Sequence, residues 1–337
     1  MPVGEKVREL IQEQGNLWEQ AVDIVDRFVE PPPFLLVGSG TSYYLAQVAA
    51  RVARNLGIAA EAASTGDVVL EPDLWLPKVG TLIVITRSGE TSEAVWALKL
   101  AEQFGKPSVA VVCGRGTSAE RVSRRTICLE GADDDTVVMI RSFTSMLIAL
   151  QATWAKQKGS DVLPLKSMAA QLPVVLERAA NVWKEIADGV RRVYILGAGV
   201  RYGIAAEGAL KIQEMSGRAA FAYSPFEFRH GPRGAVDYDD IVVVLGQEAW
   251  SHDEQLVLTD MALQTERLVG IAKEPWFAGA DARIRGRIVL PREVSDLWLG
   301  PLAIVPLQKL AWKLACDNSR DPDRPKNLTK VVEFSRG

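Results

Sequence analysis

The sequence predicts an α/β protein made of two tandem copies of one domain, each with a mainly parallel sheet between layers of helices. The first observation is a repeat, because residues 34–46 and 193–205 follow the same plan at an offset of 159 positions. The same offset relates two further pairs of apolar runs, 82–85 with 241–244 and 108–112 with 267–271. One offset kept by three separate runs indicates a duplicated domain. The second observation is that these runs are apolar without polar alternation and are separated by helical segments, which indicates a parallel sheet covered on both faces.

The chain is expected to open with a helix. Residues 5–29 carry apolar side chains at helical spacing, which predicts an amphipathic helix. Three consecutive prolines at 31–33 end it, because proline cannot continue the helical hydrogen-bond ladder. We therefore assign residues 1–30 to an N-terminal helix and expect the first domain to follow it.

The first domain is expected at residues 31–165. Its predicted strands are 34–37, 82–85, 109–112 and 126–130, and its predicted helices are 42–56 and 92–104. Gly105 follows the second of these helices as a C-terminal cap. A helical stretch from about 142 to 188 joins this copy to the next.

The second domain is expected at residues 166–316. Its last strand, at 287–291, is the counterpart of the strand at 126–130, and a helix over 302–316 closes the domain. Residues 317–337 form a tail. It begins as a loop rich in Asp, Asn, Pro and Arg and ends in a segment able to fold back over a site.

The composition argues against two classes of function. The formal net charge is −3 and no dense run of basic residues occurs, so a nucleic-acid-binding surface is not expected. No apolar run approaches the ~18 residues that span a bilayer, and the charged N-terminus is unlike a signal peptide. The three cysteines are widely separated, which is typical of reduced thiols in the cytosol. We expect a cytoplasmic protein that binds neither nucleic acid nor membrane.

The two copies differ at their glycine turns, and only the first keeps hydroxyl side chains there. It has GSGTS at 38–42 and TRSGET at 86–91, whereas the second has GAGVR at 197–201 and LGQEA at 245–249. Both hydroxyl turns follow strands and open helices, so free N–H groups and helix dipoles at the carboxyl edge of the sheet favour an anion. We predict a phosphate-monoester site made by Thr41, Ser42, Thr86, Arg87, Ser88 and Thr91.

Two other interpretations of these turns are open. Serine and threonine at helix starts are commonly only N-caps, although two such turns at one sheet edge favour the phosphate. A dinucleotide site would use Glu61, which lies about twenty residues beyond the first turn, as its ribose-binding acid. Tyr43 replaces the third glycine of that fingerprint, which makes the dinucleotide signal weak.

A second group of chemically active residues follows in the second copy. Glu207, Lys211 and Glu214 are spaced to share one helix face, and taken alone this spacing favours a solvated salt-bridge stripe, for which Glu207 and Lys211 stand in the favourable order. Of the two histidines, His252 stands in an acidic, polar segment typical of a surface. His230 lies between aromatic residues and a Gly-Pro turn, so it is the better candidate for proton transfer near neutral pH, with a structural role as the alternative.

These motifs, in this order and on a repeat, resemble the sugar isomerase (SIS) family. The resemblance rests on SGTS at 39–42, SGET at 88–91, EGALKIQE at 207–214, RHGP at 229–232 and PKNLTK at 325–330. It covers nearly the whole chain from about residue 30. It implies two tandem SIS domains, each a flavodoxin-like three-layer αβα sandwich.

The resemblance also implies roles for single residues. The hydroxyl turns hold the phosphate of a small sugar phosphate. Glu214 is the base that moves a proton between C1 and C2, Lys211 lies beside the substrate, His230 opens the sugar ring, and Lys330 engages the open-chain sugar from the tail. In that family the histidine loop reaches the active site of a neighbouring subunit, which implies a homodimer. No metal or organic cofactor is implied, and we interpret the acidic run at 133–135 as a solvated loop.

The implied activity is an aldose–ketose rearrangement of a hexosamine 6-phosphate, as in an isomerising glucosamine-6-phosphate deaminase. A fructosamine-6-phosphate deglycase and a ketose/aldose 6-phosphate isomerase are alternatives. The chain starts Met1-Pro2 and not with the cysteine nucleophile of the family's glutaminase domain, so glutamine-dependent synthesis is not expected. Arg87 replaces an uncharged amide of the family synthase, which leaves the substrate open. A non-catalytic sugar-phosphate regulator would need the hydroxyl turns but not the catalytic set.

Overall fold

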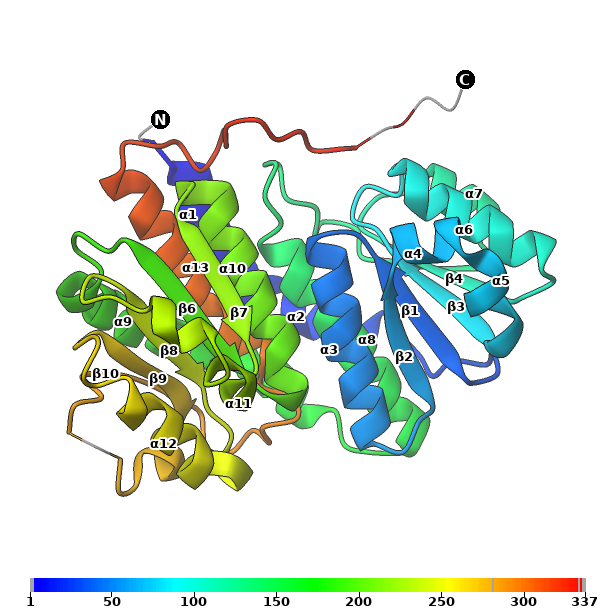
Figure 1. The fold of residues 1–337 in the computed structure, drawn as a ribbon. Coiled ribbons are helices and arrows are strands. Elements are labelled where there is room, and N and C mark those ends of the chain that lie inside the picture. Colours follow the sequence, from blue (N-terminus) through cyan, green and yellow to red (C-terminus); the bar gives the residue numbers. More distant parts are fainter. Residues whose placement is uncertain (1–2, 281, 333, 335–337) are drawn as a thin grey trace. The chain divides into compact units, whose positions relative to one another are not determined.

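The computed structural model of the protein describes residues 3–280, 282–332 and 334. It contains two five-stranded sheets, each flanked by helices (Figure 1). The chain divides into two compact units. The first-copy unit consists of Gln14–Lys166 and Asn327–Gly337, and the second-copy unit consists of Met1–Glu13 and Ser167–Lys326. The predicted α/β class with two parallel sheets is confirmed.

In the first-copy unit the strands are all parallel, in the order β2-β1-β3-β4-β5. They are β1 (Phe34–Gly38), β2 (Ala60–Ser64), β3 (Thr81–Ile85), β4 (Ser108–Val112) and β5 (Arg125–Cys128). The helices are α2 (Trp18–Asp23), α3 (Thr41–Asn55), α4 (Thr65–Leu70), α5 (Pro72–Trp75), α6 (Ser92–Gln103), α7 (Ser118–Val122) and α8 (Arg141–Lys158), with short 3₁₀ turns η1 (Gln14–Leu17) and η2 (Leu76–Lys78). Strands β1, β3 and β4 are buried along their whole length, which explains their uninterrupted apolar sequences.

The second-copy unit has its own parallel sheet, in the order β10-β9-β8-β6-β7. Its strands are β6 (Arg192–Gly197), β7 (Ala219–Tyr223), β8 (Ile241–Leu245), β9 (Leu268–Lys273) and β10 (Gly286–Leu290). Its helices are α1 (Glu5–Glu13), α10 (Tyr202–Ser216), α11 (Pro225–Phe228), α12 (Ser251–Asp260) and α13 (Gly300–Asp317), with 3₁₀ turns η3 (Gly199–Arg201), η4 (Pro232–Ala235), η5 (Glu248–Trp250) and η6 (Glu274–Phe277). Helix α9 (Leu163–Ile186) leads into this unit from the first.

The two sheets share one topology, because β7-β6-β8-β9-β10 repeats the pattern of β2-β1-β3-β4-β5. Helices α6 and α12 begin at Ser92 and Ser251, which keeps the offset of 159 positions seen in the sequence. This is the flavodoxin strand order, in which ligands bind at the carboxyl edge beside the first and third strands. In the first-copy unit the two hydroxyl turns follow those strands.

The glycines of the repeated turns have a steric cause. A Cβ on Gly38 would lie 2.4 Å from the backbone of Ser42, and one on Gly197 would lie 2.5 Å from the carbonyl oxygen of Arg201. Each glycine therefore lets a helix start directly against the strand that precedes it. Gly40 and Gly199 both take a φ of 55°, a conformation that favours glycine.

The structure departs from the predicted elements in three places. The helix expected over 5–29 is broken into α1 and α2 by the turn at Gln14–Leu17, which contains glycine and asparagine, two poor helix formers. The joining helical stretch is broken at Gly159, which caps α8 in a left-handed conformation. The edge strands β2 and β7 were not predicted, because AEAAS and AAFAY lack the β-branched residues that mark strands.

Candidate functional site

The turn after β1 places two predicted phosphate ligands in the first turn of α3. Gly40 is the N-cap of that helix, and Thr41 and Ser42 follow it, each 5% exposed. The interpretation of these two residues as N-caps is therefore wrong. Hydroxyl caps in the same unit are Ser64 and Thr117, which each accept a backbone N–H three residues further on.

The turn after β3 carries the remaining hydroxyls. Thr86 is buried directly after the strand, and the Ser88 hydroxyl oxygen accepts the backbone N–H of Glu90 at 3.2 Å. Thr91 is the N-cap of α6, but its side chain makes no capping hydrogen bond. Capping therefore does not account for the hydroxyl of Thr91 either.

The backbone of this second turn is held in place by α7. The N–H of Ala119 donates to the carbonyl oxygen of Gly89, and the N–H of Ser118 donates to the carboxylate of Glu90, both at 2.9 Å. Hydrogen bonding from Ser118 lowers the pKa of Glu90. A Cβ on Gly89 would lie 2.4 Å from the Thr117 side chain. The turn is thus fixed before any ligand binds.

Two backbone donors of this turn have no acceptor among the residues that the structure describes. Among the described residues, no acceptor contacts the N–H groups of Ser88 and Gly89. The aligned N–H groups of the second copy, on Gln247 and Glu248, do donate to protein oxygens, at 2.8 and 2.9 Å. Free backbone donors beside hydroxyl side chains at a helix start suit an oxyanion such as phosphate.

Arg87 uses its guanidinium within the protein. Its Nη1 donates to the carbonyl oxygen of Thr136 at 3.2 Å, and its Nη2 donates to the carbonyl oxygen of Lys330 at 3.2 Å. Its Nε lies 3.6 Å from the Asp133 carboxylate. These contacts connect the turn after β3 to the loop before α8 and to the tail, so the observed side chain serves to position backbone segments. A direct contact with phosphate stays a prediction.

The tail lies over the start of α6. The Ser92 N–H donates to the carbonyl oxygen of Val332 at 3.4 Å, and the Phe334 N–H donates to the Ser92 hydroxyl oxygen at 2.9 Å. The rings of Trp96 and Phe334 stack with centroids 6.4 Å apart. The Lys330 ammonium donates to Asp133 at 2.7 Å, so the predicted tail lysine belongs to the unit that carries the hydroxyl turns.

The expectation that residues 133–135 form a solvated loop is wrong for Asp134. Its carboxylate is fully buried and accepts the N–H groups of Ile140 and Arg141, at 3.1 and 2.9 Å, at the start of α8. Burial raises the pKa of Asp134, against the effect of these hydrogen bonds. The acidic run therefore contains a helix cap, because unpaired N–H groups at a buried helix start require an acceptor.

Helix α10 carries the predicted catalytic carboxylate. Lys211 and Glu207 are fully buried, with Nζ 3.5 Å from Oε1, while the side chain of Glu214 is 19% exposed and pairs with the same ammonium. Burial alone would lower the pKa of Lys211, but the charges of Glu207 and Glu214 outweigh it and raise the pKa. The three residues do share one face, and the interpretation as a solvated stripe is wrong because that face is covered.

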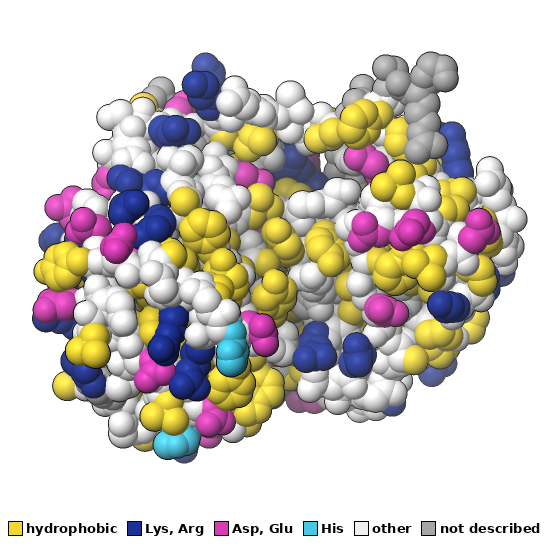
Figure 2. Space-filling model, in the orientation of Figure 1, with side chains coloured by type: hydrophobic (Ala, Val, Ile, Leu, Met, Phe, Trp, Pro, Cys, Tyr) yellow, Lys and Arg dark blue, Asp and Glu magenta, His cyan; other side chains and the backbone are white. Residues whose placement is uncertain are grey.

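His230 lies at the surface of the second-copy unit. It follows α11, and its backbone N–H donates to the carbonyl oxygen of Glu227 at 3.0 Å. No hydrogen bond or ion pair joins its ring to α10 within the described ranges. Figure 2 shows both histidine side chains of the chain on the molecular surface. The ring is therefore accessible to a ligand or to another subunit.

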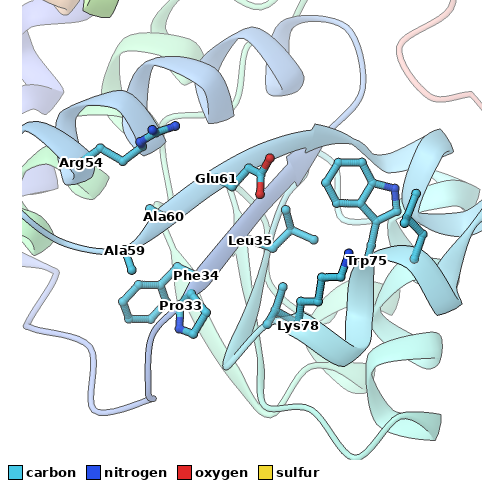
Figure 3. A pocket seen from close by; sticks show the side chains of 11 residues that line it. Pro33, Phe34, Leu35, Arg54, Ala59, Ala60, Glu61, Trp75 and Lys78 are labelled. Carbon is cyan, nitrogen blue, oxygen red and sulfur yellow. The ribbon is translucent and has the colours of Figure 1, made fainter.

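A cavity of about 640 Å³ lies at the amino edge of the first sheet, opposite the edge that carries the hydroxyl turns, and no motif in the sequence predicted it. Its lining includes Phe34 and Glu61 from the amino ends of β1 and β2, Arg54 from the end of α3, and Trp75 and Lys78 from the segment before β3 (Figure 3). Glu61 is paired with Leu35 near the start of these strands. A ribose-binding acid must lie at the carboxyl edge, so the dinucleotide interpretation is wrong.

Two further features bear on the expected chemistry. In the part of the chain that the structure describes, no three histidine, cysteine, aspartate or glutamate side chains are grouped to hold a metal ion. Within the same residues, every helix is too short or too polar to cross a membrane.

Of the predicted site residues, the hydroxyl turns and Lys330 belong to the first-copy unit, and Glu214, Lys211 and His230 belong to the second.

Comparison with known proteins agrees with the repeated fold. Residues 32–156 and 188–276 match the family model described as SIS domain. Glutamine–fructose-6-phosphate aminotransferase (isomerizing) of Pyrococcus horikoshii is 28% identical over 340 residues, which covers 94% of this chain and 54% of that protein. The enzyme of the same name from Pyrobaculum aerophilum is 28% identical, covering 88% of this chain and 50% of that one. The chain thus spans about half the length of these relatives.

Solved structures share the fold along almost the whole chain. Glucosamine-6-phosphate deaminase from Thermotoga maritima superposes with a TM-score of 0.84 at 23% identity, covering 97% of this chain and 99% of the other. Tagatose-6-phosphate ketose/aldose isomerase from Escherichia coli superposes with a TM-score of 0.76 at 24% identity, covering 96% and 95%.

Proposed function

The chain belongs to the SIS domain family, and on that premise we propose that it is a phosphosugar aldose–ketose isomerase acting on a hexosamine 6-phosphate. The observation that carries the proposal is the difference between the two copies at one turn. Ser88 and Gly89 offer N–H groups that no described protein atom accepts, beside the hydroxyls of Ser88 and Thr91, whereas the second copy satisfies the aligned groups internally. Donors kept open on a fixed turn suit a phosphate ester.

We assign the proton transfer to Glu214. In the open-chain amino sugar, its carboxylate takes the proton from C2 and returns it at C1, which converts an aldose into a ketose imine. Water then adds to C2 and ammonia leaves, so glucosamine 6-phosphate plus water gives fructose 6-phosphate plus ammonia. The ion pair with Lys211 holds the carboxylate in place, and the ammonium can stabilise the enolate-like oxygen.

We further propose that the protein acts as a homodimer, with His230 serving the active site of the neighbouring subunit in ring opening. The ring of His230 is exposed, and within the described residues no hydrogen bond or ion pair joins it to α10. This accessibility supports the role. Lys330 would then leave Asp133 to engage the open-chain sugar. The exposed pair of these two residues costs little to separate.

A product assay tests the proposal. The purified protein is given glucosamine, galactosamine and fructosamine 6-phosphates and a ketose 6-phosphate, and ammonia, free amino acid and each sugar phosphate are measured separately. We expect ammonia and ketose 6-phosphate in equal amounts from a hexosamine 6-phosphate. Release of amino acid from the fructosamine adduct would identify a deglycase instead. Binding without any turnover across the panel would identify a sugar-phosphate sensor and overturn the enzymatic proposal.

A further inference from the structure

We propose that the second copy retains an oxyanion site at the position of the first copy's phosphate turn, and that the carboxylate of Asp296 occupies it as a built-in ligand. The ligand class is a small oxyanion such as inorganic phosphate or sulfate. The inference depends on the contacts around Asp296 and not on the proposed reaction.

The two turns occupy the same place in the two sheets. β3 and β8 are aligned strands, and the turns after them lead to α6 and α12, which start 159 positions apart. At that offset Gln247 and Glu248 correspond to Ser88 and Gly89. The same pair of backbone N–H groups is therefore presented at the carboxyl edge of each sheet.

In the second copy, acidic side chains accept both groups. The N–H of Gln247 donates to Glu254 Oε2 at 2.8 Å, and the N–H of Glu248 donates to Asp296 Oδ2 at 2.9 Å. Glu254 belongs to α12 and is 2% exposed, with a second hydrogen bond of 2.8 Å from the Trp276 indole. Asp296 comes from the loop before α13, and its side chain is 21% exposed. Asp296 is thus the acceptor that solvent can reach.

A buried cation on the neighbouring turn completes the site. Arg201 stands where the first copy has Ser42, and its side chain is fully buried. Its Nη2 donates to Asp296 Oδ1 at 3.3 Å, while Nε and Nη1 have no partner among the described residues. A buried guanidinium with unused donors requires an anion nearby. Asp296 therefore bridges a backbone donor and a cation, as a bound oxyanion would.

This arrangement explains why the second copy has no hydroxyl side chains at its two turns. Because Asp296 supplies the negative oxygens, no hydroxyl donors are needed to bind an anion there. The Trp250 ring also packs against the turn, 3.0 Å from where a Cβ on Gly199 would lie. The second copy is closed to an external phosphate because Asp296 already accepts the Glu248 N–H and the Nη2 of Arg201. Removing that carboxylate leaves Arg201 and the Glu248 N–H to bind an anion from solution.

Asp296→Ala and Asp296→Asn test this, because asparagine fills the space without charge and alanine empties it. Thermal unfolding is followed in sodium sulfate and in sodium chloride of equal ionic strength. We expect sulfate to raise the Tm of Asp296→Ala by about 3 °C or more beyond its effect on wild type and on Asp296→Asn. Crystals soaked in selenate are expected to show anomalous density at Arg201 only in the alanine variant.

An equal sulfate response of the alanine variant and wild type, with no selenate at Arg201, would overturn the inference. If Asp296→Ala folds only when sulfate is present, that rescue supports it. If the variant does not fold in either salt, the same comparison is made with Asp296→Ser, and a response equal to wild type counts against the inference. The test measures neither ligand binding at the first copy's turn nor catalytic turnover. Its result is therefore independent of the proposed enzymatic function.

Discussion

The Arg87 guanidinium donates a hydrogen bond of 3.2 Å to the carbonyl oxygen of Lys330, 243 positions later in the chain. The same guanidinium donates to the carbonyl oxygen of Thr136 at 3.2 Å, and the Lys330 ammonium reaches Asp133 at 2.7 Å. One buried arginine thus connects the turn that carries Ser88 to the tail and to the loop before α8. The position of the tail lysine therefore depends on a residue of the same turn.

Arg87→Ala is expected to loosen the tail around Lys330. Without the guanidinium, Lys330 keeps its exposed pair with Asp133, which contributes about 1 kcal/mol or less, and the tail beyond it keeps two hydrogen bonds with Ser92. Trypsin should therefore cleave after Lys326 and Lys330 several-fold faster than in wild type, as followed by mass spectrometry under conditions in which circular dichroism shows a folded protein. Arg124→Ala, an exposed arginine of the same unit, is the control. Unchanged cleavage in Arg87→Ala would show that the tail is held in another way.

Loss of the turn hydroxyls should weaken phosphate binding. Ser88→Ala and Thr91→Ala are each expected to reduce the affinity for a sugar phosphate by ~1–3 kcal/mol, the value of a hydrogen bond to a charged group. Isothermal titration calorimetry measures it. Ser64→Ala is the matched control, because that hydroxyl caps α4 and should cost ~1 kcal/mol of stability without changing affinity. Full phosphate affinity in the Ser88→Ala/Thr91→Ala double variant would refute the site.

Glu214→Gln should abolish turnover and leave substrate affinity within a few-fold. Glutamine keeps the shape of the side chain but cannot accept the proton from C2. Steady-state kinetics and substrate binding are measured side by side, with the exposed Glu227→Gln as a control expected to behave as wild type. Activity of the wild type should persist after treatment with a chelator. Normal turnover by Glu214→Gln, or loss of wild-type activity on chelation, contradicts a metal-free carboxylate mechanism.

Mixing two inactive variants tests whether His230 acts across subunits. In a dimer that combines Glu214→Gln with His230→Ala, one of the two sites keeps both wild-type groups if the histidine comes from the neighbour. Random exchange at equal amounts should then restore about a quarter of wild-type activity. Each variant alone, treated in the same way, is the control. Absence of any recovery after exchange has been verified by mass spectrometry would place the histidine in its own subunit's site.

Glu254 should make stability depend on pH near neutrality. Burial, opposed by hydrogen bonds from Gln247 and Trp276, raises the pKa of Glu254 from 4.5 to about 7. Because the folded pKa lies above the unfolded one, its contribution is fully present below pH 4.5 and is lost as the pH rises through about 7. The free energy of unfolding should thus fall by about 1–3 kcal/mol across this window, as urea titrations measure. Glu254→Gln should remove this fall, and an identical pH profile in that variant would contradict the assignment.

Much of the fold could be predicted because its central strands are buried on both faces. β1, β3 and β4 appear in the sequence as short, wholly apolar runs, and their repetition at one offset identified β6, β8 and β9 as well. The glycines at 38 and 197 could also be recognised in the sequence as a repeated pair. They are required because only glycine lets the next helix begin against the strand. The edge strands β2 and β7 were missed because AEAAS and AAFAY contain no β-branched residue, whereas the edge strands β5 and β10 contain isoleucine, threonine or valine and were predicted.

Local spacing along the chain was enough to predict the duplicated α/β fold, the hydroxyl turns of the first copy and the shared face of Glu207, Lys211 and Glu214. The packing of distant segments was needed to establish that this face is covered, that Asp134 is a buried cap and that Arg87 points to the tail. Spacing states which side chains share a face but not which distant segment packs on it. Burial and hydrogen-bond partners depend on that segment, and they decide whether a charge is solvated, paired or left to bind a ligand.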